Sequence, residues 1–277
     1  MDSLVTTEWL AGELDKTDLR VVDATYFLDR DARAKFENGH IPGAVFLDLA
    51  ELADKESDLP GMVPSSEKFA SRMQSLGLGD GSRIVVYDDS ELKTAARAWW
   101  MLKTFGAHEV AILDGGLAKW KDEGRPVESG KASVRHRHFT VWKDESGIRN
   151  LEQMKANQQS KDEQIVDARP SARFTGAEDD PRSGVAAGHM RGAKNVPHSE
   201  LFNGDGTFKS QDELRAIFEE AGIDVDKPVV TMCGSGVTAA VLSFALHLIG
   251  AKKTALYDGS WAEWGAREDT NKVTGPA

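Results

Sequence analysis

The sequence of 277 residues predicts an α/β protein made of two homologous domains, each with a mostly parallel sheet flanked by helices. Three observations predict this fold class. The chain repeats itself once, short apolar runs alternate with helical patterns in both copies, and the length suits two ordinary domains better than one. Because strands that alternate with helices are joined by crossovers, helices should cover both faces of each sheet.

The repeat runs through most of the chain. Residues 21–24 (VVDA) return as 165–168 (IVDA), a shift of 144, and residues 39–44 (GHIPGA) return as 188–193 (GHMRGA), a shift of 149. The second copy therefore holds five extra residues between these blocks. The shift of 144 then recurs at five further places, so we expect it to hold without a gap from Val85 to Trp120. The matching pairs are Val85-Val86 with Val229-Val230, Thr94 with Thr238, Gly106 with Gly250, Asp114-Gly115 with Asp258-Gly259, and Trp120 with Trp264.

The repeat divides the chain into a first domain of residues 1–124, a linker of residues 125–146 and a second domain of residues 147–277. Glycine, proline, serine, histidine and charged residues cluster in the linker without periodicity, which is typical of a connection between domains. The basic run at residues 135–138 is interpreted as a solvated face of this linker.

Short β-branched runs are the predicted strands, and periodic runs between them are the predicted helices. The strands are residues 21–22, 83–87 and 110–113 in the first copy and 165–166, 229–232 and 254–257 in the second, and the clearest helices are 94–105 and 238–249. In such folds ligands bind beyond the carboxyl ends of strands. The segment after residues 229–232 is therefore the candidate site.

Composition excludes several classes of protein. With 40% apolar and 29% charged residues the chain is globular, and its net charge of −11 disfavours a general nucleic-acid or anionic-membrane binder. The most apolar stretch, residues 239–249, is too short to span a bilayer, and the N-terminus lacks the pattern of a secretory signal. A single cysteine excludes an internal disulfide and a Cys-based zinc site. We expect a cytoplasmic protein without a metal or another cofactor.

That single cysteine, Cys233, lies where a predicted strand turns into a predicted helix. Gly234 and Gly236 allow a tight loop whose amides can point at one spot, and the helix start adds free N–H groups. Both features favour the thiolate, which is the nucleophilic form. The alternative, a buried cysteine that packs as a small hydrophobe, is less consistent with this loop.

Two phosphate chemistries fit the loop poorly. A phosphate-binding loop of an NTPase needs a lysine that is missing here. A cysteine phosphatase needs an arginine six positions after the cysteine to hold phosphoryl oxygens, and that position is Ala239.

Residues 233–238 (CGSGVT) resemble the active loop of the 3-mercaptopyruvate sulfurtransferases, a branch of the rhodanese family. Residues 36–44 and 257–264 resemble the family's N-terminal and C-terminal motifs. The resemblance implies two rhodanese-like domains, of which only the second is catalytic. It also implies that Cys233 carries a persulfide, that Ser235 contacts the substrate sulfur or relays a proton, and that the outer sulfur is cradled by Gly234, Gly236, Val237 and Thr238.

Arg173 and Arg182 match the family's two substrate-binding arginines in their Arg-Phe and Pro-Arg contexts. Both lie in residues 169–188, which hold the five extra residues of the second copy. A guanidinium group suits the adjacent carboxylate and carbonyl oxygens of 3-mercaptopyruvate. The alternative is that both arginines are ordinary solvated surface residues.

The resemblance implies that sulfur passes from 3-mercaptopyruvate to Cys233 and then to an external acceptor such as thioredoxin, a small thiol or cyanide, while pyruvate leaves. In the thiosulfate-preferring branch of the family the loop is similar to Cys-Arg-Lys-Gly, with two cationic residues. This chain has the neutral pair Gly234-Ser235 in their place. A thiosulfate-preferring enzyme and a non-catalytic persulfide carrier remain as alternatives.

The first copy and its surroundings depart from a catalytic pattern. With a constant shift of 144, the residue of the first copy that corresponds to Cys233 is Asp89. The first domain is therefore expected to be structural. Some relatives have a histidine and an aspartate that complete a relay with the loop serine. Gly61 and Ala50 stand at those positions here, so the relay does not carry over to this chain.

His40 and His189 occur at equivalent places in both copies, which favours a structural role for each. Trp120 and Trp264 recur in the same way and are expected to pack in the core.

Overall fold

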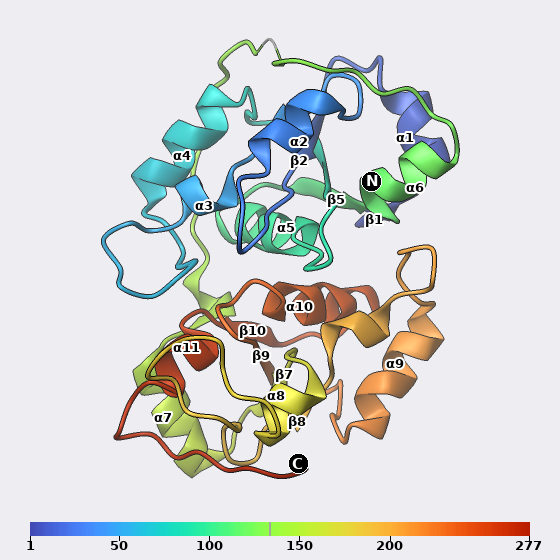
Figure 1. Cartoon of the computed structure of the whole chain (residues 1–277). Coiled ribbons are helices and arrows are strands. Elements are labelled where there is room, and N and C mark those ends of the chain that lie inside the picture. Colours follow the sequence, from blue (N-terminus) through green and yellow to red (C-terminus); the bar gives the residue numbers. More distant parts are fainter. Residues whose placement is uncertain (133) are drawn as a thin grey trace. The chain divides into compact units, whose positions relative to one another are not determined.

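The computed structural model describes residues 1–132 and 134–277, which form two compact units (Figure 1). Unit 1 contains residues 1–55, 63–144 and 202–208, and unit 2 contains residues 56–62, 145–201 and 209–277. Each unit therefore includes one short segment from the other half of the chain. Part of the expected linker packs on unit 1, because Phe139 is buried and the Trp142 amide donates to the carbonyl of Phe105.

Unit 1 is built on a five-stranded parallel sheet in the order β1-β5-β4-β2-β3. Its strands are β1 (Leu4–Val5), β2 (Leu19–Asp23), β3 (Val45–Phe46), β4 (Arg83–Tyr87) and β5 (Glu109–Leu113). Its helices are α1 (Thr7–Glu13), α2 (Arg33–Asn38), α3 (Leu49–Leu52), α4 (Ser66–Ser75), α5 (Ala95–Thr104) and α6 (Gly116–Asp122).

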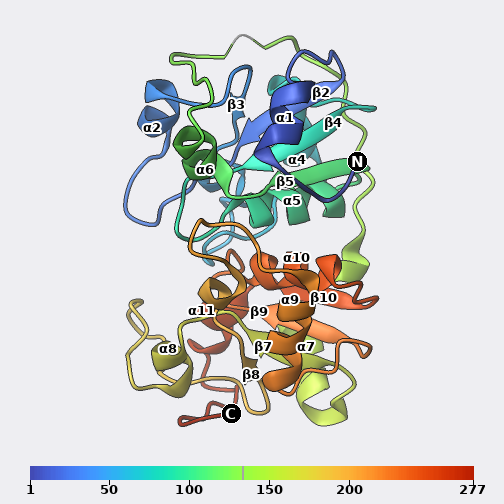
Figure 2. The same ribbon diagram turned by 90° about the vertical axis from the view of Figure 1, so that its right-hand side faces the viewer.

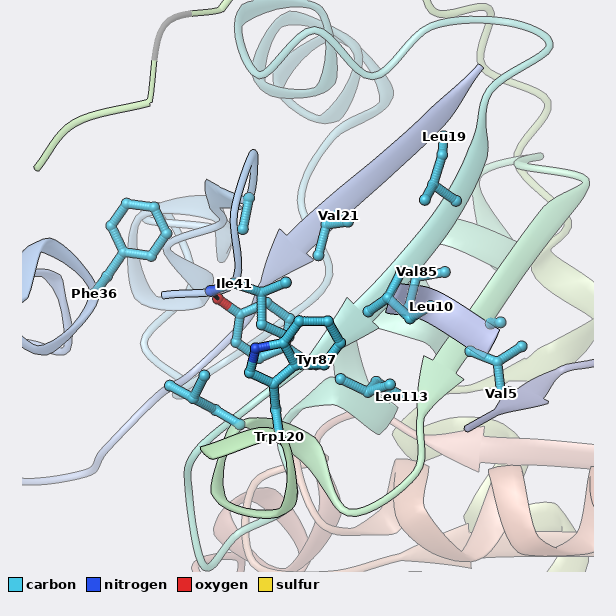
Figure 3. Packing of buried hydrophobic residues seen from close by; sticks show 13 residues of the cluster. Val5, Leu10, Leu19, Val21, Phe36, Ile41, Val85, Tyr87, Leu113 and Trp120 are labelled. Carbon is cyan, nitrogen blue, oxygen red and sulfur yellow. Dashed lines mark hydrogen bonds between the residues drawn. The ribbon is translucent and has the colours of Figure 1, made fainter. Parts of the chain in front are cut away.

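The core of unit 1 follows from the alternation of side chains along its strands. Val21, Val85 and Ala111 face one side, where they pack with Leu10 of α1 and Trp120 of α6. Figure 3 shows this cluster, with Trp120 close to the strand residues. Helix α5 packs on β4 and β5.

Unit 2 repeats the arrangement, with the strand order β6-β10-β9-β7-β8, all parallel (Figure 2). Its strands are β6 (Ile148–Arg149), β7 (Gln164–Asp167), β8 (Lys194–Asn195), β9 (Val229–Met232) and β10 (Thr254–Tyr257). Its helices are α7 (Leu151–Ser160), α8 (Ser171–Thr175), α9 (Gln211–Glu220), α10 (Ala239–Leu248) and α11 (Ser260–Trp264), with 3-10 turns η1 (Glu145–Gly147) and η2 (His198–Leu201). The predicted fold class is confirmed, and so are the strands and helices around the candidate site.

The strand register corrects one expectation. Val21 pairs with Val85, but its counterpart Ile165 pairs with Val230, so β4 and β9 correspond at a shift of 145. A hydrogen bond agrees with this register: the amide of Ala24 donates to the carbonyl of Tyr87, as the amide of Ala168 donates to Met232.

The counterpart of Cys233 is therefore Asp88, and the assignment of Asp89 was wrong. The shift returns to 144 where α5 and α10 begin, so the first copy has one extra residue in its loop. The two valine pairs look alike in either register, which is why the sequence pattern alone chose the wrong one. Among the described residues no helix is long and apolar enough to cross a membrane.

Candidate active site

Cys233 follows β9 directly, and its side chain is buried, with only 2% of the residue exposed. The beginning of α11 holds its backbone in place. The Cys233 amide donates to Ser260 Oγ (3.1 Å), and the Trp261 amide donates to the carbonyl of Cys233 (2.9 Å). The Ala262 amide donates to the carbonyl of Gly234 (2.9 Å). These bonds set the position of the thiol-bearing residue at the carboxyl end of the sheet.

The loop after Cys233 turns sharply into α10. Gly236 has a φ of 76°, a left-handed conformation that glycine adopts without strain. Thr238 precedes the helix without a hydrogen bond from its side chain to the helix end. Gly234 and Ser235 are half-buried, whereas Val237 is buried, so the first two residues form the open side of the loop.

Arg182 lies against this loop. A Cβ atom at position 234 would come within 2.6 Å of Arg182 Nη2, so a side chain there would have to displace the guanidinium group. Asp180, whose carboxylate is 3% exposed, holds Arg182 Nη1 at 3.0 and 3.1 Å and also accepts from the Arg182 amide. The aspartate thus orients the arginine toward Gly234 at the open side of the loop.

Arg173 lies on α8, beside Phe174, which belongs to the core of unit 2. Its Nε is buried without a hydrogen-bond partner among the described residues, and the nearest carboxylate oxygen, Glu178 Oε1, is 3.7 Å away. An unmade hydrogen bond at a buried donor is costly, so this donor is available for a ligand. Arg182 therefore touches the loop, whereas Arg173 makes no hydrogen bond to it among the described residues.

Gly61 belongs to unit 2 although it comes from the first half of the chain. Its φ is 74°, and a Cβ atom there would lie 3.2 Å from the carbonyl oxygen of Ser235. Position 61 is thus next to the loop, and here it presents only backbone.

A buried ion pair at the carboxyl end of β7 was not among the predicted site residues. Arg169, 4% exposed, donates through Nε and Nη2 to both carboxylate oxygens of Asp167, which is fully buried (2.7–3.1 Å). Its guanidinium carbon lies 4.4 Å from the ring centre of Trp261. The sequence held one signal for this pair, because the first copy has Thr25 at the position where the second copy has Arg169.

The two repeated histidines have the structural contacts that their symmetry suggested. His40 stacks on Phe36, and its Nδ1 lies 2.8 Å from the carbonyl of that residue. His189 stacks on Phe174 and contacts its carbonyl at the same distance. Trp120 and Trp264 are buried in the two cores. Within residues 1–132 and 134–277, no three His, Cys, Asp or Glu side chains are grouped so that they could hold a metal ion.

Comparisons with known proteins agree with this architecture. The model of the rhodanese-like domain matches residues 6–123 and again residues 150–267. A 3-mercaptopyruvate sulfurtransferase of Escherichia coli K12 is 42% identical over 269 residues, covering 96% of this chain and 95% of that protein. A thiosulfate sulfurtransferase of Cricetulus griseus is 39% identical over 271 residues, covering 95% and 91%.

Among solved structures, the crystal structure of SseA from Escherichia coli has a TM-score of 0.86 and 40% identity, covering 95% of this chain and all of that one. The match extends over both halves. The chain therefore belongs to the rhodanese family and carries one rhodanese-like domain in each half.

Proposed function

We propose that this protein transfers the sulfur of 3-mercaptopyruvate, through a persulfide on Cys233, to an external thiol or to cyanide, and releases pyruvate. One observation carries the proposal. The only cysteine of the chain ends β9 in a backbone-fixed loop, and the guanidinium group of Arg182 lies against that loop at Gly234. The extensive identity to a 3-mercaptopyruvate sulfurtransferase supports the same reaction.

The proposed chemistry has two half-reactions. The Cys233 thiolate attacks the sulfur of 3-mercaptopyruvate, and the S–S bond forms as the C–S bond breaks. The electron pair of the broken bond stays on the carbon side as the enolate of pyruvate, which takes up a proton as it leaves. An acceptor thiolate then attacks the outer sulfur, and Cys233 leaves as a thiolate again.

The first copy shows which hydrogen-bond donors converge on the position that corresponds to Cys233. Its counterpart Asp88 places a carboxylate oxygen 2.7 Å from the amide of Ala95 and 3.2 Å from Thr94 Oγ1, both at the start of α5. The second copy has Ala239 and Thr238 in the corresponding places. We propose that the start of α10 offers a donor of the same kind to the outer sulfur of the persulfide.

In the proposed site, Arg182 and Arg173 bind the substrate carboxylate and carbonyl. Charge that develops on the enolate oxygen is stabilised by fixed cationic donors of this kind. The Asp180 carboxylate orients Arg182, and the buried Nε of Arg173 is a donor without a hydrogen-bond partner among the described residues. Ser235 is proposed to contact the substrate sulfur, and the outer sulfur of the persulfide to rest on the amides of Gly234, Gly236, Val237 and Thr238.

A thiosulfate-preferring enzyme is the second candidate, because relatives of both names are about equally similar to this chain. The neutral residues Gly234 and Ser235 favour the carboxylate-bearing donor. Without a second cysteine the persulfide has no internal thiol to resolve it, so an external acceptor such as thioredoxin, a small thiol or cyanide is required. The lone cysteine also favours a reducing compartment, and we propose the cytoplasm.

The test is intact-mass spectrometry after addition of 3-mercaptopyruvate, together with steady-state release of pyruvate in the presence of cyanide. One added sulfur atom and many turnovers are expected, and neither should occur with Cys233→Ser. An adduct without continued pyruvate release would indicate a persulfide carrier. Faster turnover with thiosulfate than with 3-mercaptopyruvate would favour the second candidate.

A further inference from the structure

We propose that Arg169 is a positioning residue for the sulfur-transfer site, which fixes the Cys233 loop and the segment that bears Arg182 to the end of the sheet. This inference rests on the proposed function. Arg169 reaches the loop through Trp261.

The first observation is that burial of Arg169 costs hydration free energy that its ion pair barely offsets. Arg169 and Asp167 are both buried, and a buried ion pair of this kind adds little net stability, since both ions lose their hydration. The pair is held by three hydrogen bonds from the guanidinium group to the carboxylate. The remaining donor contact of Arg169 Nη2 is to the carbonyl of Gly188 (2.9 Å).

The second observation is the path from Arg169 to the reacting cysteine. The guanidinium plane covers the ring of Trp261, which a cation–π contact fixes further. The backbone amide of Trp261 donates to the carbonyl of Cys233, and its indole Nε1 donates to the carbonyl of Ala186 (2.9 Å). One aromatic residue therefore connects Arg169 to the nucleophile and to the segment that follows Arg182.

The third observation comes from the first copy, which serves as an internal control. Asp23 occupies the position of Asp167, and it accepts from the amide of Thr25 (2.8 Å), as Asp167 accepts from the amide of Arg169 (2.9 Å). The same turn therefore forms with a threonine in place of the arginine. Trp261 is likewise replaced by Leu117, whose amide still donates to the carbonyl of Asp88.

The first copy thus forms the same strand end without an arginine or a tryptophan, and both residues occur in the copy that has the cysteine. Arg169 and Trp261 thus serve to keep Cys233 and the segment that bears Arg182 in the positions that sulfur transfer requires. Since a displacement of about 1 Å at a reacting group can cost about 100-fold in rate, loss of Arg169 should lower kcat by about 10- to 100-fold. The effect on KM should be small, because Arg169 does not touch the substrate.

The test compares Asp167→Asn/Arg169→Thr, which removes both charges together, with Arg169→Lys and with the matched control Asp23→Asn in the first copy. The double variant avoids leaving an unpaired buried carboxylate, so it should fold. We expect its kcat to fall at least tenfold with KM within threefold of the original, while the thermal midpoint changes by only a few degrees. Arg169→Lys should recover part of kcat, and Asp23→Asn should leave kcat unchanged.

Alkylation of Cys233 by iodoacetamide supplies a readout that does not depend on the sulfur donor. The alkylation rate should change in the double variant and stay constant in Asp23→Asn. The inference would be overturned if the original protein is active and the double variant has the same kcat and the same alkylation rate. If the original protein itself forms no persulfide, the proposed function fails, and the alkylation rates still decide the role of Arg169.

Discussion

Ser260 shows how a single residue can hold the nucleophile in place. Its φ is 50°, a left-handed conformation that is strained for a residue with a side chain, and the first copy has Gly116 there with a φ of 59°. The serine is fully buried, accepts from the Cys233 amide and donates to the carbonyl of Tyr257 (2.8 Å). A strained serine in place of a glycine is explained by these two hydrogen bonds.

The first prediction separates the strain from the hydrogen bonds. Ser260→Ala keeps the strained Cβ and leaves the buried Cys233 amide unpaired, so the free energy of unfolding should fall by about 1–3 kcal/mol. Ser260→Gly loses the same bonds but relieves the strain, so it should be destabilised less. Both variants should slow persulfide formation. Denaturant unfolding and single-turnover kinetics would check this, and greater stability of the alanine variant than of the glycine variant would contradict it.

The second prediction concerns Asp88, the counterpart of Cys233. Burial raises the pKa of this carboxyl from 3.8 to about 6, although the Ala95 amide partly opposes the shift. Between these two pH values the folded state binds more protons than the unfolded state, so stability due to this group falls as pH rises and is lost above pH 6. Asp88→Asn should therefore stabilise the protein at pH 7 by about 1–3 kcal/mol and have little effect at pH 4.

The matched control for Asp88→Asn is Asp89→Asn. Asp89 forms a partly exposed ion pair with Lys35 (2.7 Å), so its loss should change stability by less than about 1 kcal/mol. Neither variant should alter turnover. Thermal melts across this pH range would show the difference, and a stability gain for Asp88→Asn that does not depend on pH would show that the buried charge is not its source.

At the scale of elements, we expect the connection between β9 and α10 to set which sulfur donor the site prefers. The third prediction is that replacing Gly234-Ser235 by Arg-Lys shifts preference toward thiosulfate, a dianion without a carboxylate, by roughly tenfold in the ratio of kcat/KM values. A side chain at position 234 must also displace the guanidinium group of Arg182, so turnover of 3-mercaptopyruvate should fall further.

Arg173→Ala provides the opposite comparison. This change removes a hydrogen-bond donor for the carboxylate, which 3-mercaptopyruvate has and thiosulfate lacks. The kcat/KM for 3-mercaptopyruvate should therefore fall far more than the kcat/KM for thiosulfate. Steady-state kinetics of both variants on both donors would check the prediction. If the two donors responded in parallel to both changes, the specificity would not arise from these residues.

At the scale of the whole molecule, the catalytic unit is not encoded by one continuous half of the chain. Residues 56–62 belong to unit 2, and Gly61 lies against the carbonyl of Ser235. In the same way residues 202–208 belong to unit 1, where the Phe208 amide donates to Asp114 Oδ1 (2.8 Å) and Asp205 pairs with Lys119 (3.2 Å).

The fourth prediction follows from this exchange of segments. A fragment of residues 147–277 lacks Gly61 and its neighbours, so its loop is more open to water and should turn over at least tenfold more slowly than the full chain. Cleavage of the full protein at the exposed Lys131 keeps every segment present and should preserve activity. Equal rates for the isolated fragment and the full protein would show that residues 56–62 do not contribute to the site.

Much of this protein could be predicted from its sequence because the relevant signals are local. The repeat, the alternation of buried strands with helices, and a cysteine between a strand and a glycine-rich turn each lie within a few consecutive residues. Backbone geometry converts such patterns directly into elements and their order. The edge strands β1, β3, β6 and β8 have two residues each, too few for a periodic pattern to reveal.

The tertiary structure alone decided which distant residues meet. The one-residue change of register between β4 and β9, which makes Asp88 the counterpart of Cys233, is set by pairing across the sheet, and similar valines fit either register. The contacts of Arg169 with Trp261 and of Gly61 with the Ser235 loop join segments far apart in the sequence. Such contacts depend on how the packed core orients whole elements, and no short pattern of residues encodes that orientation.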